Sequence, residues 1–275
     1  MNWLQGFFYG LISGFTEFMP VSSQAHQKLM LQIFGQSNSD PVCNLIVHLC
    51  AVVALFFGLR GYIARLRREQ HLAAHRRRDH RSGDVRTGYD LRLIRTAIVP
   101  AMLMMLLLVL TRNWTENHLL IAIFSIINGV ILFLAERFPH GNKDSRHMSV
   151  LDALVLGLIG SLSVFPGISR VGASVSYATM RGADKQQSVN WVLLLSIPVV
   201  LMLCIFDIVG IATGNVVAAN FSVIAGYFTA GAGSLIGTYL CVMFARNILS
   251  RTSMAVFAYY SWGIALLSFA LYLIS

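Results

Sequence analysis

Six apolar runs constrain the fold of this chain more than any other feature of its sequence. They lie near residues 42–60, 95–111, 118–137, 187–209, 219–245 and 254–274. A helix of about 17–25 apolar residues crosses a lipid bilayer, so each run is long enough for one crossing. Only 12% of the residues are charged, whereas a soluble domain carries about 25%. The sequence therefore predicts an all-α polytopic membrane protein with about six membrane-crossing helices, folded as one membrane domain over residues 1–275.

Two further apolar stretches, 1–33 and 150–186, are interrupted by Gly, Pro, Ser and a charged residue. Such segments enter a membrane and return to the same face where their backbone lines a cavity. We therefore expect two broken re-entrant helical hairpins. The stretches "GLISGFTEFMPVSS" and "GLIGSLSVFPGIS" also share one spacing of Gly, Pro and Ser. The matching positions are Gly14, Pro20 and Ser23 in the first stretch and Gly160, Pro166 and Ser169 in the second.

Three predicted crossings follow each broken stretch. Because three is odd, the second half starts from the opposite face of the membrane, which predicts an inverted-topology repeat. Repeat one covers about 1–137 and repeat two about 150–275.

The basic residues predict the orientation. Eleven Arg lie between Arg60 and Arg95, and with its four acidic residues this segment has a net charge of +7. A basic segment between apolar spans marks the cytoplasmic side and contacts anionic lipid head groups. We therefore expect a basic cytoplasmic loop at about 60–95, both chain termini outside, and Ser37 and Ser82 on opposite faces. No nucleic-acid motif accompanies the charge, so nucleic-acid binding is not predicted.

Ionisable residues at membrane depth cost about 2.5–3.5 kcal/mol on insertion scales and therefore indicate function. In "TEFMPVSSQAH" they are Glu17 and His26, accompanied by Ser22 and Ser23. A helix-end carboxylate, serine caps and an interfacial histidine are the purely structural interpretation. In "FPGISRVGAS", Arg170 follows a helix break. Free backbone N–H groups with a guanidinium form a phosphate site, and an Arg that holds two helix ends together is the structural alternative.

A carboxylate beside phosphate oxygens is repulsive unless a divalent cation lies between them. If the two broken segments meet at the midplane, the carboxylate of Glu17 lies close to a phosphate that is bound by Arg170. Mg²⁺ and Ca²⁺ take hard oxygen ligands, so one of these ions is the predicted cofactor. His26 can serve as nucleophile or general acid/base, with Ser23 as the alternative nucleophile. The residues alone thus predict an intramembrane phosphate-handling site with a lipid-accessible substrate.

"TEFMPVSSQAH" and "FPGISRVGAS" resemble the two signature segments of the undecaprenyl-diphosphate phosphatases of the bacitracin-resistance type. The similarity covers nearly the whole chain, including "LIVHL" at 45–49, "LAER" at 134–137 and "LLLSIP" at 193–198. The resemblance implies a multi-pass enzyme of the bacterial inner membrane whose active-site cavity faces outside the cytoplasm. It also implies removal of one phosphate from undecaprenyl diphosphate, which recycles the lipid carrier for peptidoglycan synthesis, with a divalent metal required.

By position, the resemblance assigns Glu17 to the second acid of the family's acidic motif, and Ser23 and His26 to its serine and histidine. Ser169 and Arg170 match its Ser-Arg pair. The chain departs from the family pattern at four positions. Ser13 stands where the pattern has an acid or amide, and Val171 stands where it has Ser. Ser174 replaces a Thr, and Gly160 replaces a Gln.

His48 occupies a place where many family members have His or Gln, and a buried helix histidine explains it equally well. The predicted catalytic residues are Glu17, Ser23, His26 and Arg170; the predicted phosphate-binding residues are Ser22, Ser169, Arg170, Gly172 and Ser174; the predicted metal ligand is Glu17; and Ser13 and His48 are weaker candidates.

Two other functions compete with hydrolysis. A flippase or transporter that moves a polyprenyl phosphate head group would also use broken helices in inverted repeats. A structural membrane protein would leave the insertion cost of Glu17 and Arg170 unexplained. The expected partners are a polyprenyl diphosphate lipid and the surrounding membrane lipids, and a homodimer is compatible with the sequence.

Overall fold

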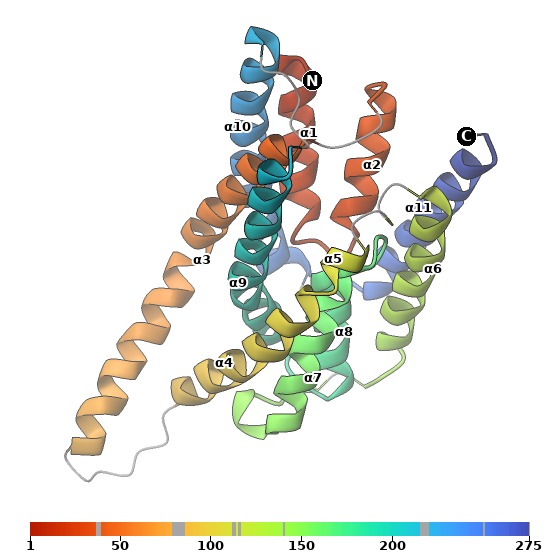
Figure 1. Ribbon diagram of the computed structural model, residues 1–275. Coiled ribbons are helices and arrows are strands. Elements are labelled where there is room, and N and C mark those ends of the chain that lie inside the picture. Colours follow the sequence, from red (N-terminus) through yellow and green to blue (C-terminus); the bar gives the residue numbers. More distant parts are fainter. Residues whose placement is uncertain are drawn as a thin grey trace.

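The computed structural model describes residues 1–36, 40–78, 86–111, 114, 117–139, 141–214, 220–249 and 251–274 (Figure 1). Ser37 and Ser82 lie outside the described residues. Within the described ranges the chain is helical and contains no strand, so the predicted all-α class is confirmed. The helices are α1 Trp3–Thr16, α2 Ser23–Ile33, α3 Pro41–Arg78, α4 Arg86–Met105, α5 Leu108–Thr111, α6 His118–Ala135, α7 Val150–Gly160, α8 Arg170–Met180, α9 Lys185–Ala212, α10 Phe221–Phe244 and α11 Met254–Ile274.

Five of these helices are long and apolar enough to cross a membrane, namely α3, α6, α9, α10 and α11. Large apolar side chains on them face outward, as a lipid environment requires; Phe228 is 77% exposed and Leu266 is 72% exposed. The sixth predicted run, 95–111, is divided between α4 and α5 by a turn at 106–107. Pro100 lies inside α4, and the charged side chains of Arg92 and Arg95 occupy its first half.

The basic segment at 60–95 is more ordered than the predicted loop. Helix α3 continues as one helix to Arg78, and α4 begins at Arg86. In Figure 1 the second half of α3 projects away from the bundle at the end opposite both chain termini. The Arg-rich sequence is therefore presented largely on helices.

The two broken stretches form helical hairpins. Helices α1 and α2 are joined through 17–22, whereas α7 and α8 are joined through the 3₁₀ turn η3 (Ser161–Val164) and 165–169. Figure 1 shows the first hairpin entering from the end that holds both termini and the second entering from the opposite end. Their turns meet inside the bundle, which places the first residues of α2 and α8 at one level.

Helix α1 packs along α10 with its backbone almost in contact. A Cβ on Gly6 or Gly10 would overlap the carbonyl of Gly226 or Ala230. Small residues at such positions allow close helix packing in membranes. Because the register advances in the same direction on both helices, α1 and α10 run parallel.

The second hairpin is held in the same manner, since a Cβ on Gly157 of α7 would overlap the carbonyl of Ala97 on α4. Helix α1 thus packs on α10 of the second half, and α7 packs on α4 of the first half. This exchange of partners agrees with the predicted inverted topology. The repeat boundaries themselves stay a prediction.

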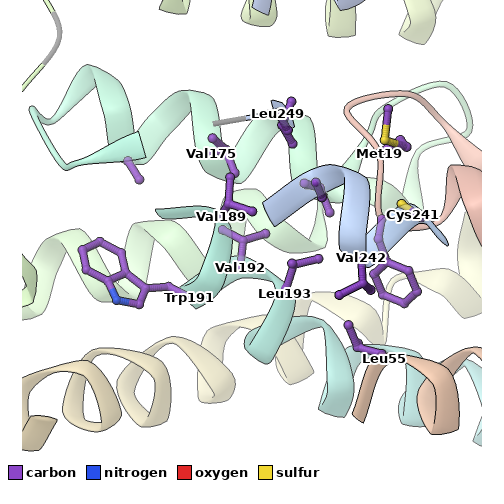
Figure 2. Packing of buried hydrophobic residues seen from close by; sticks show 14 of the residues in the cluster. Met19, Leu55, Val175, Val189, Trp191, Val192, Leu193, Cys241, Val242 and Leu249 are labelled. Atoms are coloured by element: carbon purple, nitrogen blue, oxygen red, sulfur yellow. The ribbon is translucent and has the colours of Figure 1, made fainter. Parts of the chain in front are cut away.

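The largest apolar cluster lies between α3, α8, α9 and α10 (Figure 2). Leu55, Trp191, Leu193 and Val242 are at most 1% exposed. The indole Nε1 of Trp191 donates to Asp90 Oδ1 over 3.1 Å, which ties α9 to α4. This packing fixes the helices that surround the two hairpin turns.

Candidate active site

The two hairpin turns are hydrogen-bonded to each other. The backbone N–H of Gly167 donates to Ser22 Oγ over 3.0 Å, and Ser169 Oγ donates to the carbonyl of Met19 over 2.7 Å. Gly167 has a φ of +116°, a conformation that side chains with a Cβ rarely adopt. A Cβ there would also lie 2.6 Å from the backbone nitrogen of Ser125. The turns therefore cross as one fixed unit.

Asn128 of α6 clamps this crossing from the side. Its Oδ1 accepts the backbone N–H of Ser169 over 2.9 Å, and its Nδ2 donates to the carbonyl of Pro20 over 3.4 Å and to Ser261 Oγ over 2.9 Å. The side chain is fully buried. Asn128 was not predicted, although an amide inside an apolar span is a signal that the sequence contains.

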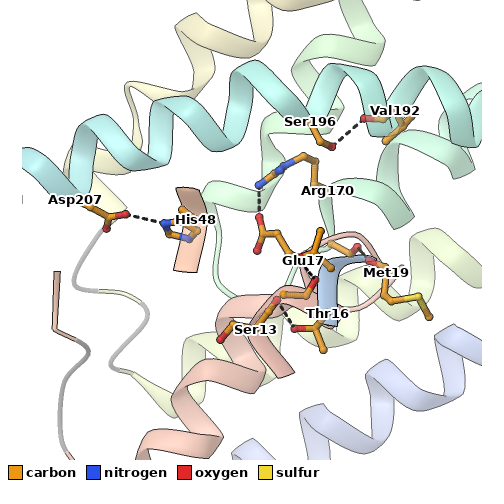
Figure 3. A network of polar contacts seen from close by, with 12 residues as sticks. Ser13, Thr16, Glu17, Met19, His48, Arg170, Val192, Ser196 and Asp207 are labelled. Carbon is orange, nitrogen blue, oxygen red and sulfur yellow. Dashed lines mark hydrogen bonds and ion pairs between the residues drawn. The ribbon is translucent and has the colours of Figure 1, made fainter. Parts of the chain in front are cut away.

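Glu17 and Arg170 meet at the crossing, as the sequence predicts for two broken segments that converge. Arg170 Nη2 donates to Glu17 Oε1 over 2.7 Å, and each side chain is 5% exposed (Figure 3). Glu17 follows α1 and Arg170 begins α8, so residues 153 positions apart contribute one charge each. This buried pair is the electrostatic centre of the candidate site.

The pair leaves polar atoms without partners. Arg170 Nε and Nη1 are buried and have no hydrogen-bond partner within the described part of the chain, and the same holds for the hydroxyls of Ser13 and Ser174. A buried hydrogen-bond donor without an acceptor costs about 1–3 kcal/mol, and more when the donor is charged. The guanidinium therefore offers two nitrogens to an oxyanion, and phosphate oxygens match its fork.

Ser22 and Ser169 are the N-caps of α2 and α8. Ser22 Oγ accepts from Ala25 N over 3.4 Å, and Ser169 Oγ accepts from Gly172 N over 3.0 Å. Ser23 is the first residue of α2 and is half-buried. A Cβ on Gly172 would lie 3.1 Å from the Cα of Pro20, so this glycine permits the turns to approach each other.

The sequence of the chain decides the family. It matches the family described as bacitracin resistance protein BacA over residues 6–267. The chain belongs to this family. It is 30% identical over 269 residues to an undecaprenyl-diphosphatase of Carboxydothermus hydrogenoformans, covering 95% of this chain and 94% of that protein.

Two further BacA-family relatives show the same extent of similarity. Undecaprenyl-diphosphatase 1 of Shouchella clausii is 26% identical over 272 residues, covering 98% of this chain and 96% of the relative. An undecaprenyl-diphosphatase of Campylobacter curvus is 29% identical over 252 residues, covering 91% of each chain. The predicted family membership, as a divergent member, is confirmed.

In this BacA-family chain, His26 belongs to a second cluster beside the hairpin crossing. Its Nδ1 lies 2.6 Å from the carbonyl oxygen of Ser22, and its Nε2 lies 2.7 Å from the hydroxyl of Tyr260 on α11. The imidazole also stacks on the Tyr260 ring, with 5.7 Å between the ring centroids. In the described part of the chain, no hydrogen bond joins His26 to Glu17 or Arg170. Tyr260 gave no signal in the sequence, since tyrosines are frequent at membrane interfaces.

His48 lies in a pair that the sequence analysis missed. Its Nδ1 is 2.6 Å from Oδ2 of Asp207, which joins α3 to α9 (Figure 3). Asp207 stands near the end of a long apolar helix, where a single carboxylate looks like an ordinary interfacial residue. The two residues are 159 positions apart in the sequence, so the sequence alone did not indicate their contact.

The donor atoms around Glu17 decide whether a divalent cation fits this BacA-family site. The described residues contain no group of three or more His, Cys, Asp and Glu side chains that could hold a metal ion. Mg²⁺ is commonly bound through one or two carboxylates together with phosphate oxygens and water. One carboxylate, with the unpartnered Ser13 hydroxyl one helical turn before it, therefore fits an ion whose remaining ligands come from a phosphate group.

Proposed function

We propose that this BacA-family protein is a membrane phosphatase that converts undecaprenyl diphosphate to undecaprenyl phosphate and inorganic phosphate, and so recycles the lipid carrier of cell-wall synthesis. The observation that carries the proposal is the buried Arg170, which pairs with Glu17 and keeps two nitrogens free for an oxyanion. The names of the relatives give the substrate. The large apolar side chains that face outward from the helices suit a substrate with a long hydrocarbon chain.

Arg170 has the task of binding the terminal phosphate. Its free Nε and Nη1 donate to two oxygens of that phosphate and stabilise the charge that develops there during transfer. Ser174 lies about one turn after Arg170 on α8, and Ser169 is the N-cap directly before Arg170. We assign these serines to orientation of the phosphate.

Glu17 would hold a divalent cation, Mg²⁺ or Ca²⁺, with Ser13 as a weaker neighbouring oxygen ligand on the preceding turn. When bound, such an ion neutralises phosphate oxygens that would otherwise repel the carboxylate. Because Ser13 supplies a hydroxyl in place of a second carboxylate, we expect the affinity for the cation to be weak.

Ser23 and His26 are the two candidates for the nucleophile, and the contacts favour Ser23. Both ring nitrogens of His26 are engaged, one with the Ser22 carbonyl and the other with Tyr260. Ser23 stands at the start of α2, next to the hairpin crossing. Its Oγ would bond to the terminal phosphorus while the bridging P–O bond breaks, which releases the lipid monophosphate. Water then hydrolyses the phosphoserine.

The orientation follows from the charge distribution. The Arg-rich ends of α3 and α4 belong on the cytoplasmic side of the inner membrane. Both termini and the entrance of the first hairpin then face outside the cytoplasm. We place the active-site opening on that outer side.

A flippase is the second candidate, because half-helices from opposite faces that meet at a buried charged pair are common in transporters. Purified protein in liposomes is incubated with undecaprenyl diphosphate and Mg²⁺ or Ca²⁺, and released phosphate and bound lipid are measured. The phosphatase releases phosphate, and Arg170→Lys loses most of the rate because a Lys cannot form the fork. Arg181→Lys, at an ion pair whose Arg side chain is 55% exposed, is the matched control. Lipid binding without phosphate release at any cation concentration would favour the flippase.

A further inference from the structure

A cavity of about 190 Å³ lies between the first half of α4, the 3₁₀ turn η2 (Ser145–His147) and the start of α7. Its lining includes Leu93 and Ala153, which are at most 4% exposed, so the cavity reaches below the surface of the protein. None of the residues of the candidate active site lines it. The cavity is therefore a second site, separate from the crossing of the two hairpins.

This cavity carries positive charge. Arg92 of α4 and Arg146 of η2 line it, and none of its lining residues in the described ranges is an Asp or a Glu. Asp144 Oδ2 lies 3.3 Å from Arg146 Nε and orients that guanidinium. Arg92 makes no ion pair with any residue that the structure describes. Because two cations that face one cavity repel each other, an anion between them is favourable.

The lining also supplies groups that bind phosphate oxygens. Tyr89, Thr96 and Ser145 bring hydroxyl groups to the cavity, and α7 begins beside it, where a helix presents backbone N–H groups and the positive end of its dipole. The acidic residue in the first turn of α7, Asp152, already forms an ion pair with Arg181 Nε over 2.6 Å. Guanidinium groups combined with such donors recognise phosphate.

The cavity lies where the surface changes from polar to apolar. Arg92 and Thr96 line it from α4. Val99 and Leu103 continue the same face of this helix, because residues three or four positions apart are neighbours, and they are 61% and 64% exposed. On α7 the exposed Leu151 follows directly after the first residue. Figure 1 shows the starts of α4 and α7 at the end of the bundle opposite both chain termini. In a membrane this change marks the boundary between head groups and hydrocarbon.

We propose that this cavity binds the phosphate head group of an anionic phospholipid from the leaflet that adjoins the Arg-rich ends of α3 and α4. Arg92 and Arg146 hold the phosphate, and the hydrocarbon chains lie against Val99 and Leu103. Basic pockets between membrane helices bind the head groups of anionic lipids. A soluble phosphate ion has the same charged group, but it leaves the apolar continuation of the α4 face without a partner. The structure thus assigns one defined lipid site, whereas the sequence predicts only a general attraction of residues 60–95 to lipid.

The test uses the full-length protein in detergent micelles that contain phosphatidylcholine, titrated with phosphatidylglycerol. Native mass spectrometry counts the phosphatidylglycerol molecules retained, and thermal unfolding measures the stabilisation. Arg92→Gln removes a charge from the cavity. Arg95→Gln is the matched control, because Arg95 is exposed on the same helix and does not line the cavity. Thr96→Phe fills the cavity and leaves the charge unchanged.

We expect wild type to retain one phosphatidylglycerol molecule and to melt at a higher temperature as this lipid is added, because a ligand of the folded state stabilises it. Charge-assisted hydrogen bonds are the strong ones, so Arg92→Gln should lower the affinity at least about tenfold. Arg95→Gln should lower it about threefold or less, because its charge acts through screening solvent. Thr96→Phe should abolish retention of the lipid. If that variant does not fold, the comparison of Arg92→Gln with Arg95→Gln decides.

Two results would overturn the proposal. Equal losses of affinity in Arg92→Gln and Arg95→Gln would mean that the basic surface as a whole attracts the lipid. The second arm adds inorganic phosphate to protein with phosphatidylcholine as the lipid. A rise in melting temperature as large as that with phosphatidylglycerol, and lost in Arg92→Gln, would assign the cavity to a soluble phosphate instead. Neither readout requires phosphate release, so the outcome is independent of the proposed phosphatase function.

Discussion

Gly14 joins the packing of α1 to the geometry of the site, and Gly14→Ala tests this connection. A Cβ at this position would lie 2.6 Å from the Ser234 carbonyl oxygen and 2.7 Å from Thr238 Oγ1. Real Cβ atoms do not approach oxygen closer than about 3.0 Å, so α1 and α10 must separate by about 0.4 Å. Glu17 follows one turn later and must move with α1.

The expected loss of stability is the balance of three effects. Overpacking costs about 1–3 kcal/mol, and the bond from Thr238 Oγ1 to the Gly14 carbonyl, 3.1 Å long, contributes about 0.5–1.5 kcal/mol. Alanine returns up to about 1 kcal/mol through its higher helix propensity. The net loss is about 2 kcal/mol, which lowers the melting temperature by roughly 4–8 °C in a chain of this size.

Thermal unfolding in detergent measures this loss, and phosphate release measures the displacement of Glu17. Gly263→Ala is the matched control, because Gly263 lies in the membrane-spanning α11 and an added Cβ meets nothing within 4 Å. The control should keep or slightly raise the melting temperature. If Gly14→Ala unfolds at the same temperature as Gly263→Ala with full activity, the close approach of α1 and α10 does not position the site.

Three further predictions concern the Asn128 clamp, the divalent cation and the orientation in the membrane. Asn128→Leu removes the amide that clamps the hairpin crossing and should cost about 2–4 kcal/mol, because the Ser169 N–H, the Pro20 carbonyl and the Ser261 hydroxyl each lose their bond to it inside the protein; thermal unfolding checks it, with Asn142→Leu on the exposed loop as control. Chelation of divalent cations should abolish phosphate release reversibly, and Ser13→Glu should lower the cation concentration needed for half-maximal rate, because it adds a carboxylate ligand. In a background without the native cysteines, Gln32→Cys should label from outside intact cells and Asn142→Cys should label only after permeabilisation; external labelling of both would refute the orientation.

The hairpins and their meeting point were predictable from the sequence, because they follow from the free-energy cost of placing polar and charged groups in an apolar stretch. A Pro, a Gly and a charge within an apolar stretch are expensive unless the segment folds back and pairs its charges. The repeated spacing of Gly14 and Pro20 then indicated that both turns occupy equivalent places. The Glu17–Arg170 contact confirms this convergence.

The partners of the two histidines were not predictable, because their contacts depend on helix rotation and depth. His26 and Tyr260 are 234 positions apart, and nothing in either apolar helix specifies which face meets the other. The run at 95–111 shows a different limit. Its apolar composition predicts a crossing, but Arg92 and Arg95 lie in the first half of α4 and the turn at 106–107 ends this helix, so its apolar part is short.

The Glu17–Arg170 pair leads to a last prediction, which concerns affinity as well as rate. In the structure the carboxylate occupies one nitrogen of the guanidinium and neutralises its charge. Removing one partner of a buried pair leaves an uncompensated charge and typically costs about 3–5 kcal/mol. Glu17→Gln should therefore unfold at a lower temperature than wild type when no anion is bound.

An anion should then stabilise the variant more than it stabilises wild type, because it no longer competes with a carboxylate. Inorganic pyrophosphate is the probe, with chelator present so that no cation bridges it to Glu17. A tenfold gain in affinity adds up to about 1.4 kcal/mol of stabilisation at saturating probe, whereas phosphate release from the lipid should fall in the same variant. The double variant Glu17→Gln/Arg170→Met lacks the guanidinium, so pyrophosphate should not change its melting temperature. A pyrophosphate shift in Glu17→Gln no larger than that of wild type would mean that Arg170 is committed to holding the two hairpins together, and the phosphate must then be bound elsewhere.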